Sequence, residues 1–242
     1  MKKMMKAVAA LMLMMTVVFA AGCTKTDDPT NGGDNNEVNL NGTGTYSGHD
    51  YVDLGLPSGT LWATCNVGAT TPEGYGSYFA WGETETKTNY DWNTYKWSKG
   101  NYDQLTKYCC DTVLGYHHFT DNLTLLQTED DAATANWGNG WCMPTDEQLQ
   151  ELIQSTTHVY KRLNGKGGRL FTAPNGHSLF LPFAGMHEDD NLFGKDGDGY
   201  YWSKSLDTRW SERAWMLYMG NPIVQGIQRH CGRSVRAVRS NQ

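Results

Sequence analysis

Six cysteines and seven histidines are the side chains of this 242-residue chain best suited to nucleophilic or metal chemistry. Two of the cysteines, Cys109 and Cys110, are adjacent, and His117 and His118 follow shortly after them. A thiolate activated by an imidazole is a common nucleophile, and both groups are zinc ligands. However, the chain has no C-x-x-C pair, its cysteine spacing fits no zinc module, and no third group is evident that would orient a Cys–His pair. We therefore expect structural cysteines, no metal and no cofactor.

A second set of reactive side chains lies in one acidic stretch, residues 187–199. Its histidine and acidic members are His187, Glu188, Asp189, Asp190, Asp196 and Asp198. Two carboxylates at a defined separation could serve as acid and base in a hydrolase, although a sequence does not show that separation. The stretch does not fit an EF-hand, because Phe193 and Tyr200 fall at ligand positions. A solvated acidic loop is therefore the favoured interpretation, and its side chains are candidates for ligand binding.

Aromatic residues are a third candidate for recognition, since the chain has nine tryptophans and 13 tyrosines. Aromatic faces stack on sugar rings and also dominate protein interfaces. Four tryptophans lie in strand-like segments and are expected in the core: Trp62, Trp141, Trp202 and Trp215. Trp92, Trp97 and Trp210 lie in irregular segments, which makes them candidates for a surface platform, with loop packing as the alternative role.

Two short helices are predicted to position these residues. In the stretch GWCMPTDEQLQELI, Thr145 and Gln148 match the capping box, in which each side chain bonds a backbone amide of the other. The apolar positions that follow form one stripe facing a core (Leu149, Leu152 and Ile153). Upstream, Thr128 is predicted to cap a helix over residues 129–137, and Gly138 to end it.

The rest of the domain has the pattern of short strands and turns. Residues 51–56 and 60–65 are two apolar and aromatic runs around a Pro-Ser-Gly turn, which predicts a β-hairpin. Residues 82–124 are polar and irregular, which predicts packed loops. Further strands are predicted over residues 75–81, 159–163, 169–173, 178–183, 200–203, 214–219 and 234–238. Two adjacent helices between strand-rich halves predict an α+β fold.

Six blocks of the sequence, in order, resemble the FISUMP domain, the Fibrobacter succinogenes major paralogous family. They are YVDLGLPSGTLWATCNVGA (51–69), EGYGSYFAWGE (73–83), ATANWGNGWCMPTDEQLQELI (133–153), LFLPFAGM (179–186), GYYWSKS (199–205) and GRSVRAVR (232–239). The resemblance covers residues 49–240. It implies a C-type-lectin-like architecture, with two short helices on a twisted, mostly antiparallel sheet, long loops, and the first and last strands together. Such domains occur on secreted bacterial proteins and lipoproteins.

The chain departs from the active members of the wider C-type-lectin-like superfamily. Calcium-dependent lectins carry Glu-Pro-Asn or Gln-Pro-Asp followed by Trp-Asn-Asp, and neither motif occurs here. Formylglycine-generating enzymes need two nearby cysteines close to the C-terminus, where this chain has only Cys231. The resemblance instead places the segments of Cys142 and Cys231 side by side, which implies a disulfide, with two buried thiols as the alternative. By the same reasoning Cys65 would pair with Cys109 or Cys110.

The N-terminus predicts export and a lipid anchor. Three lysines precede an uncharged apolar run too short to span a bilayer, which is typical of a signal peptide over residues 1–22. The run ends Ala-Ala-Gly-Cys, which resembles a bacterial lipobox and implies lipidation of Cys23. Residues 23–45 predict a flexible tether, and their Asp27–Asp28 pair resembles the export signal of surface lipoproteins. We expect residues 46–242 to form one domain, anchored to the outer membrane and exposed at the cell surface.

Charge narrows the choice of partners. The net charge of -6 becomes -9 without residues 1–22, which carry three lysines and no acid. An acidic chain with no basic run is a poor binder of nucleic acid. We expect a non-catalytic binding module that recognises a glycan or a protein through loops 184–199 and 205–212. The alternatives are a hydrolase-like enzyme using His187 and the loop carboxylates, and a structural component of a surface or fimbrial assembly.

One modification site is also a candidate. Asp111-Thr112-Val113 resembles the short Asp-Thr-aliphatic acceptor for O-glycosylation in some exported proteins of gut anaerobes. A match of three residues commonly arises by chance, so Thr112 is a candidate site and no more.

The lipobox predicts that Cys23→Ser releases the protein from the membrane fraction, because one lipidated residue provides the only anchor expected. Fractionation of cells that express the wild-type and variant chains, with immunoblotting of each fraction, measures this. Membrane association that is unchanged in the variant would contradict the lipoprotein prediction.

Overall fold

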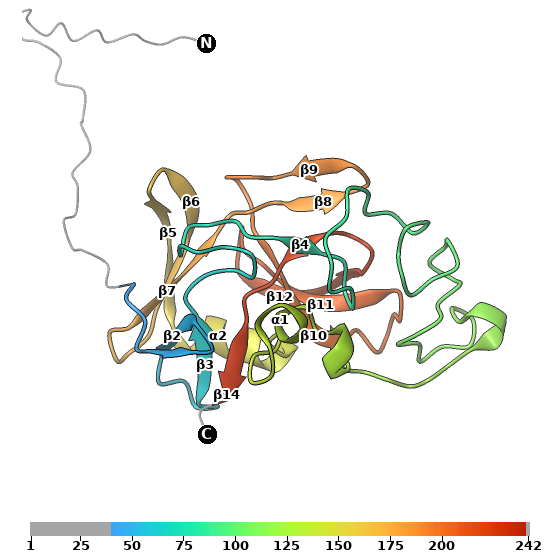
Figure 1. The fold of residues 1–242 in the computed structure, drawn as a ribbon, viewed down its shortest axis with the longest axis horizontal. Coiled ribbons are helices and arrows are strands. Elements are labelled where there is room, and N and C mark those ends of the chain that lie inside the picture. Colours follow the sequence, from blue (N-terminus) through green and yellow to red (C-terminus); the bar gives the residue numbers. More distant parts are fainter. Residues whose placement is uncertain (1–39, 241–242) are drawn as a thin grey trace, which may run out of the picture. The chain divides into compact units, whose positions relative to one another are not determined.

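The computed structural model describes residues 40–240, which form short and mostly antiparallel strands with two α-helices (Figure 1). The predicted α+β class is confirmed at this level. The predicted signal peptide, Cys23 and most of the tether lie outside the described residues. None of the described helices is long and apolar enough to cross a membrane.

The first and last described strands belong to one sheet. It has the order β1-β2-β3-β14, with β1 Gly44–Tyr46, β2 His49–Asp53, β3 Thr60–Ala63 and β14 Val238–Ser240. The pairing of β2 with β3 confirms the predicted hairpin, in which Val52 lies opposite Trp62. β1 begins inside the predicted tether, because the turn at Ser47 and Gly48 lets residues 44–46 pair with β2.

A five-stranded sheet occupies the centre of the described domain. Its order is β12-β11-β10-β13-β4, with β12 Ile223–Gln228, β11 Arg213–Tyr218, β10 Tyr200–Leu206, β13 Arg233–Ser234 and β4 Tyr78–Phe79. β10 and β13 are the one parallel pair among the described strands. The predicted strand 234–238 is therefore divided, since β13 belongs to this sheet and β14 to the first one.

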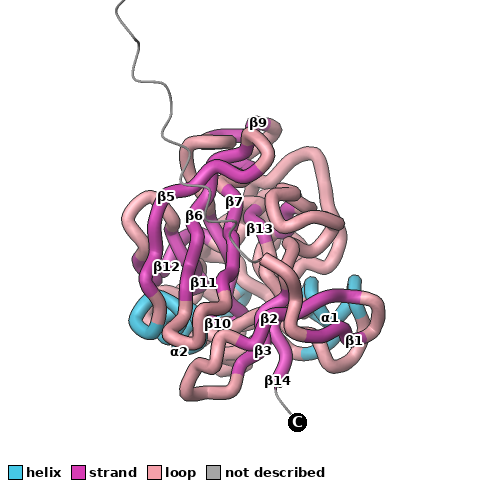
Figure 2. The backbone as a smooth tube through the Cα atoms, turned by 90° about the vertical axis from the view of Figure 1, so that its left-hand side faces the viewer, coloured by secondary structure: helices cyan, strands magenta, loops and turns pink. Residues whose placement is uncertain are grey.

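Two smaller sheets complete the strands. β5 Thr157–Leu163, β6 Lys166–Thr172 and β7 Ser178–Pro182 form a three-stranded sheet, and Figure 2 shows them side by side. β8 Met186–Glu188 and β9 Asn191–Phe193 form a two-stranded hairpin at one edge of the domain (Figure 1). The sequence did not predict this hairpin, because its residues are acidic and polar rather than β-branched.

Both helices begin with a side-chain cap. In α2, Asp146–Ser155, the capping box is present as predicted, since Thr145 accepts from the Gln148 amide and Gln148 accepts from the Thr145 amide. The start of the other helix was predicted wrongly. Residues 128–130 form a 3₁₀ turn, and α1, Ala132–Trp137, is capped by Asp131, whose carboxylate also accepts from the Met143 amide. A carboxylate that accepts from three amides competes well with a threonine hydroxyl as the cap.

Three arginines of the last segment lie in the interior. Arg229, Arg233 and Arg236 are each under 3% exposed, and among the described residues none of them forms an ion pair. Arg236 instead donates to Asn66 Oδ1 at 2.9 Å, to the Ala63 carbonyl at 3.0 Å and to the Phe180 carbonyl at 3.1 Å. One guanidinium therefore connects the end of β3, the loop after it, and β7.

Arg236→Lys should lower the free energy of unfolding by about 3 kcal/mol. A lysine ammonium keeps the charge, but it does not reach the three separate acceptors that the planar guanidinium bonds. Each buried acceptor left unpaired costs about 1–3 kcal/mol. Urea unfolding monitored by circular dichroism measures the change. Arg162→Lys on the exposed face of β5 is the matched control and should stay within about 0.5 kcal/mol of wild type. A loss under about 1 kcal/mol for Arg236→Lys would contradict this role.

Candidate functional site

Backbone bridges fasten the β8–β9 hairpin to two distant segments, one bridge from β8 and one from the hairpin turn. His187 bridges Gly232, and Asp189 bridges Tyr90. Gly232 is required there, because a Cβ at this position would lie 2.6 Å from the Tyr90 ring. The bridges bring three of the predicted candidates, His187, Glu188 and Asp189, next to residues 230–232.

Three potential metal-donor side chains meet where β8 lies beside residues 230–232. Ligand atoms of Glu188, His230 and Cys231 all lie within 4.8 Å of one another. The Cys231 Sγ lies 3.6 Å from the His230 Nε2. His230 is 5% exposed and Cys231 3% exposed, whereas Glu188 is half-buried at the rim.

Aromatic rings and one arginine enclose the cluster. The Trp92 ring lies 4.6 Å from His230, and His187 lies between Tyr78 at 4.7 Å and Tyr90 at 5.4 Å. The buried Arg233 lies on the far side, with its guanidinium 4.5 Å from the Trp202 ring. This surrounding is largely apolar, so it penalises charged forms of the side chains within it.

Burial sets the protonation states of the pair. Desolvation, with the positive charge of Arg233 as a second cause, lowers the pKa of His230 to about 4. Burial also raises the pKa of the Cys231 thiol. At neutral pH the pair is therefore a neutral imidazole beside a thiol, and not a thiolate–imidazolium nucleophile. The His230 Nδ1 has no hydrogen-bond partner among the described residues, so the third, orienting group of a catalytic triad is also missing there.

The predicted recognition face is not one surface. Loop 184–199 enters β10 at one end and loop 205–212 leaves it at the other. β10 has seven residues and spans about 20 Å. The second loop contains Trp210, which is 53% exposed and carries Arg213 over its ring at 5.5 Å. Its Ser211 accepts from the Cys110 amide, whereas loop 184–199 contacts the same irregular segment 20 residues earlier, at Tyr90.

The other predicted site residues are dispersed. Trp97 donates its indole N–H to the Gly82 carbonyl at 2.7 Å, and Lys96 and Lys107 lie over its ring. Asp196 accepts a hydrogen bond from the Tyr75 hydroxyl. Asp198 raises the pKa of Tyr218 through a hydrogen bond.

The remaining candidates are exposed. Asp190 is exposed in the hairpin turn, and Thr112 is exposed in a turn of the irregular segment. The cluster therefore unites Trp92, His187, Glu188 and Asp189 with His230 and Cys231, for which the only sequence signal was that they are adjacent.

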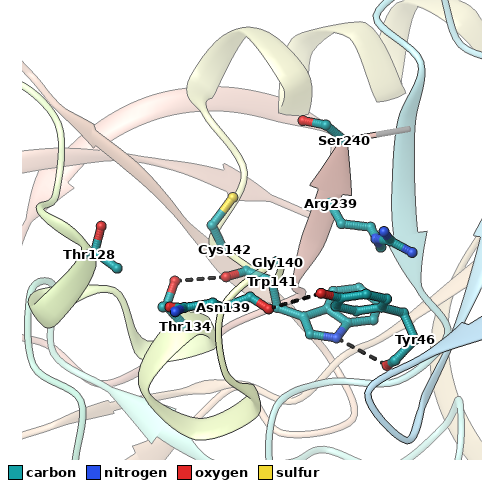
Figure 3. Close-up of a pocket in the computed structure, with 9 residues that line it drawn as sticks. All are labelled: Tyr46, Thr128, Thr134, Asn139, Gly140, Trp141, Cys142, Arg239 and Ser240. Atoms are coloured by element: carbon teal, nitrogen blue, oxygen red, sulfur yellow. Dashed lines mark hydrogen bonds between the residues drawn. The ribbon is translucent and has the colours of Figure 1, made fainter. Parts of the chain in front are cut away.

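A second candidate is a pocket of about 300 Å³ near the last strand (Figure 3). Its walls are Tyr46, Thr128, Thr134, Asn139, Gly140, Trp141, Cys142, Arg239 and Ser240. The polar rim suits a sugar, but its aromatic groups are already engaged. The Trp141 ring is buried and donates its indole N–H to the Tyr46 carbonyl, and the Arg239 guanidinium lies 3.8 Å from the Tyr46 ring.

The five described cysteines are all unpaired, contrary to the predicted disulfides. Cys142 lies beside Val238 in the backbone pairing and its sulfur lies 3.9 Å from the Lys204 Nζ, whereas the Cys231 sulfur contacts the preceding residue, His230. The segment beside Cys142 is therefore β14 and not the stretch before β13 that contains Cys231. Cys65 and Cys109 each donate to a nearby carbonyl, of Ala69 and Asp111 respectively.

Comparisons with family profiles, with curated proteins and with solved structures found no match to this chain. The resemblance to the FISUMP domain and to C-type-lectin-like folds therefore stays a prediction.

The thiols give a direct measurement. In a Cys23→Ser chain unfolded without reductant, we expect five reactive thiols, whereas two disulfides would leave one. In the folded chain the reaction should be slow, because burial raises the pKa of all five thiols and the thiolate is the reactive form. Counting with a chromogenic disulfide reagent, before and after denaturation, provides both values. Three or fewer thiols after unfolding would contradict the free-thiol structure.

Proposed function

We propose that the chain is a non-catalytic binding module, lipid-anchored through Cys23 at the cell surface, that recognises a partner protein through the β8–β9 hairpin. The observation that carries this proposal is the exposure of two adjacent large apolar side chains on β9. Leu192 is 38% exposed and Phe193 49% exposed, although the strand is otherwise polar. Successive residues of a strand face opposite sides, so the hairpin offers an apolar side chain on each face.

The hairpin also has the charge and the support of a recognition element. Asp189 and Asp190 at its turn are exposed and Glu188 is half-exposed, so the apolar pair has an acidic rim. An apolar centre with a polar rim is the usual anatomy of a protein interface, and a partner with a basic rim would complement it. The backbone bridges to Tyr90 and Gly232 hold the turn and β8, which lowers the ordering cost of binding.

A protein fits these residues better than a glycan does. Sugar recognition depends on free aromatic faces, and the predicted tryptophans do not form a shared platform. Trp92 stacks on His230 and Trp97 is covered by two lysines, while Trp210 lies beyond the other end of β10. The pocket of Figure 3 has its aromatic rings buried or covered as well.

An enzyme is also less well supported. Hydrolysis by paired carboxylates needs two of them at a fixed separation around a bound substrate. Asp189 and Asp190 are exposed at the hairpin turn, Asp196 bonds Tyr75, and Glu188 is the one described carboxylate that offers a donor atom to the cluster of His230 and Cys231. The neutral His230–Cys231 pair adds no activated nucleophile.

A photo-reactive benzophenone amino acid at position 193 of the full chain tests the proposal. In cells of the source organism, irradiation should give discrete adducts that disappear on protease treatment. The same group at Ile223, a strand residue that is 50% exposed, is the matched control and should give none. With the captured partner purified, Phe193→Ser should weaken binding about 30-fold, the effect of losing one interface hot spot.

Two results would contradict the proposal. Adducts of equal yield at positions 193 and 223 would show that the labelling is not specific to the hairpin. Adducts that resist protease and disappear with glycosidases would make the ligand a glycan.

A further inference from the structure

The spacing of the buried donors His230 and Cys231, beside β8, matches the coordination shell of a small divalent metal. A tetrahedral zinc ion holds sulfur at about 2.3 Å and nitrogen at about 2.0–2.1 Å, which places the two donor atoms about 3.5–3.6 Å apart. The Cys231 Sγ and the His230 Nε2 are 3.6 Å apart. The third donor, Glu188, is within 4.8 Å and half-buried, so rotation of its side chain closes the remaining distance.

The state of His230 is a second, independent observation. The side chain is 5% exposed, and in the described part of the chain its only polar contact is the Cys231 sulfur. Its Nδ1 has no partner there, and an ion bound at Nε2 would not give it one. When the ring proton is on Nδ1, the lone pair of Nε2 is directed toward the Cys231 sulfur, where it is available to a metal ion.

We propose that Glu188, His230 and Cys231 bind one divalent cation of the zinc class. The donor set of one thiolate, one imidazole and one carboxylate suits Zn²⁺ and Co²⁺, and it does not suit Ca²⁺ or Mg²⁺, which prefer oxygen. On binding, the Cys231 thiol loses its proton to solvent and the sulfur becomes the metal ligand. Three protein donors leave one tetrahedral position for water.

The site would join two segments that the backbone already brings together. Glu188 belongs to β8, whereas His230 and Cys231 belong to the segment before β13. The ion would therefore fasten the hairpin that carries Leu192 and Phe193 to the interior of the domain. The thiolate and Glu188 offset the charge of the ion, and Arg233 lies close enough to stabilise the thiolate. This inference concerns Glu188, His230 and Cys231, and it holds whether or not Leu192 and Phe193 bind a protein.

Cobalt gives the clearest test, because a cysteine thiolate on Co²⁺ produces a near-ultraviolet charge-transfer band. The full chain, purified reduced and metal-free, should develop this band with one equivalent of Co²⁺ and lose it when Zn²⁺ is added. Cys231→Ser should abolish the band. Cys142→Ser, which removes another buried thiol, is the matched control and should retain it in full.

A second variant keeps the test independent of folding. Glu188→Gln leaves both buried donors in place at a half-exposed position, and it should weaken Co²⁺ binding at least tenfold. Zn²⁺ should raise the melting temperature of the wild-type chain and not that of Cys231→Ser. The absence of a thiolate band at stoichiometric Co²⁺, a band that persists in Cys231→Ser, or unchanged affinity in Glu188→Gln would each overturn the proposal.

Discussion

Three arginines buried without carboxylate partners are the constraint on which the rest of the described domain depends. A guanidinium does not lose its proton in a protein, so each one must be solvated by the fold itself. Arg229 donates to the carbonyls of Lys107 and Tyr108 and lies near the rings of Trp81 and Tyr95. Arg236 likewise donates to the Asn66 side chain and to two backbone carbonyls. Carbonyl dipoles and ring faces take the place of water in both cases.

These contacts explain how strands of two to seven residues hold together in four separate sheets. Arg229 fastens the irregular segment 82–124, and Arg236 connects the ends of β3 and β7. The hydroxyl of Tyr201 on β10 adds a bond to Pro182 and receives one from Asn66, which is itself held by Arg236. The last nine residues before β14 therefore connect most of the sheets, and they do so through side chains more than through strand pairing.

The same residues set the position of the candidate site. His230 follows Arg229 directly and Cys231 precedes Arg233 by two residues, so their backbone lies between two buried guanidinium groups. Arg233 donates to the Met186 sulfur on β8, next to the bridge between His187 and Gly232. The contacts that hold the buried arginines therefore also position the backbone of His230 and Cys231. Positioning two of the three donors before a ligand arrives favours binding, because it lowers the cost of ordering.

Local chemistry was predictable from the sequence, and long-range placement was not. The capping box of α2 and the β2–β3 hairpin depend on residues within a few positions of each other, and both were predicted. The buried arginines were not, because arginine is among the residues least often found fully buried. The predicted disulfide failed for a related reason, since the chain changes sheets between Cys231 and Val238. The hairpin had no apolar alternation to reveal it, and only the fold brings Glu188 to His230.

The turn of the hairpin and the strand before it differ in a way that matters for recognition. The side chains of Asp189 and Asp190 at the turn are exposed, whereas β8 adjoins an apolar interior in which charge is disfavoured. Glu188, the last residue of β8, lies at the boundary between them. Ligation of Glu188 by a cation would remove one carboxylate from the acidic rim and would also limit the motion of β8. Metal occupancy and partner binding would then be coupled in free energy, since each favours the ordered hairpin and each lowers the entropy cost left to the other.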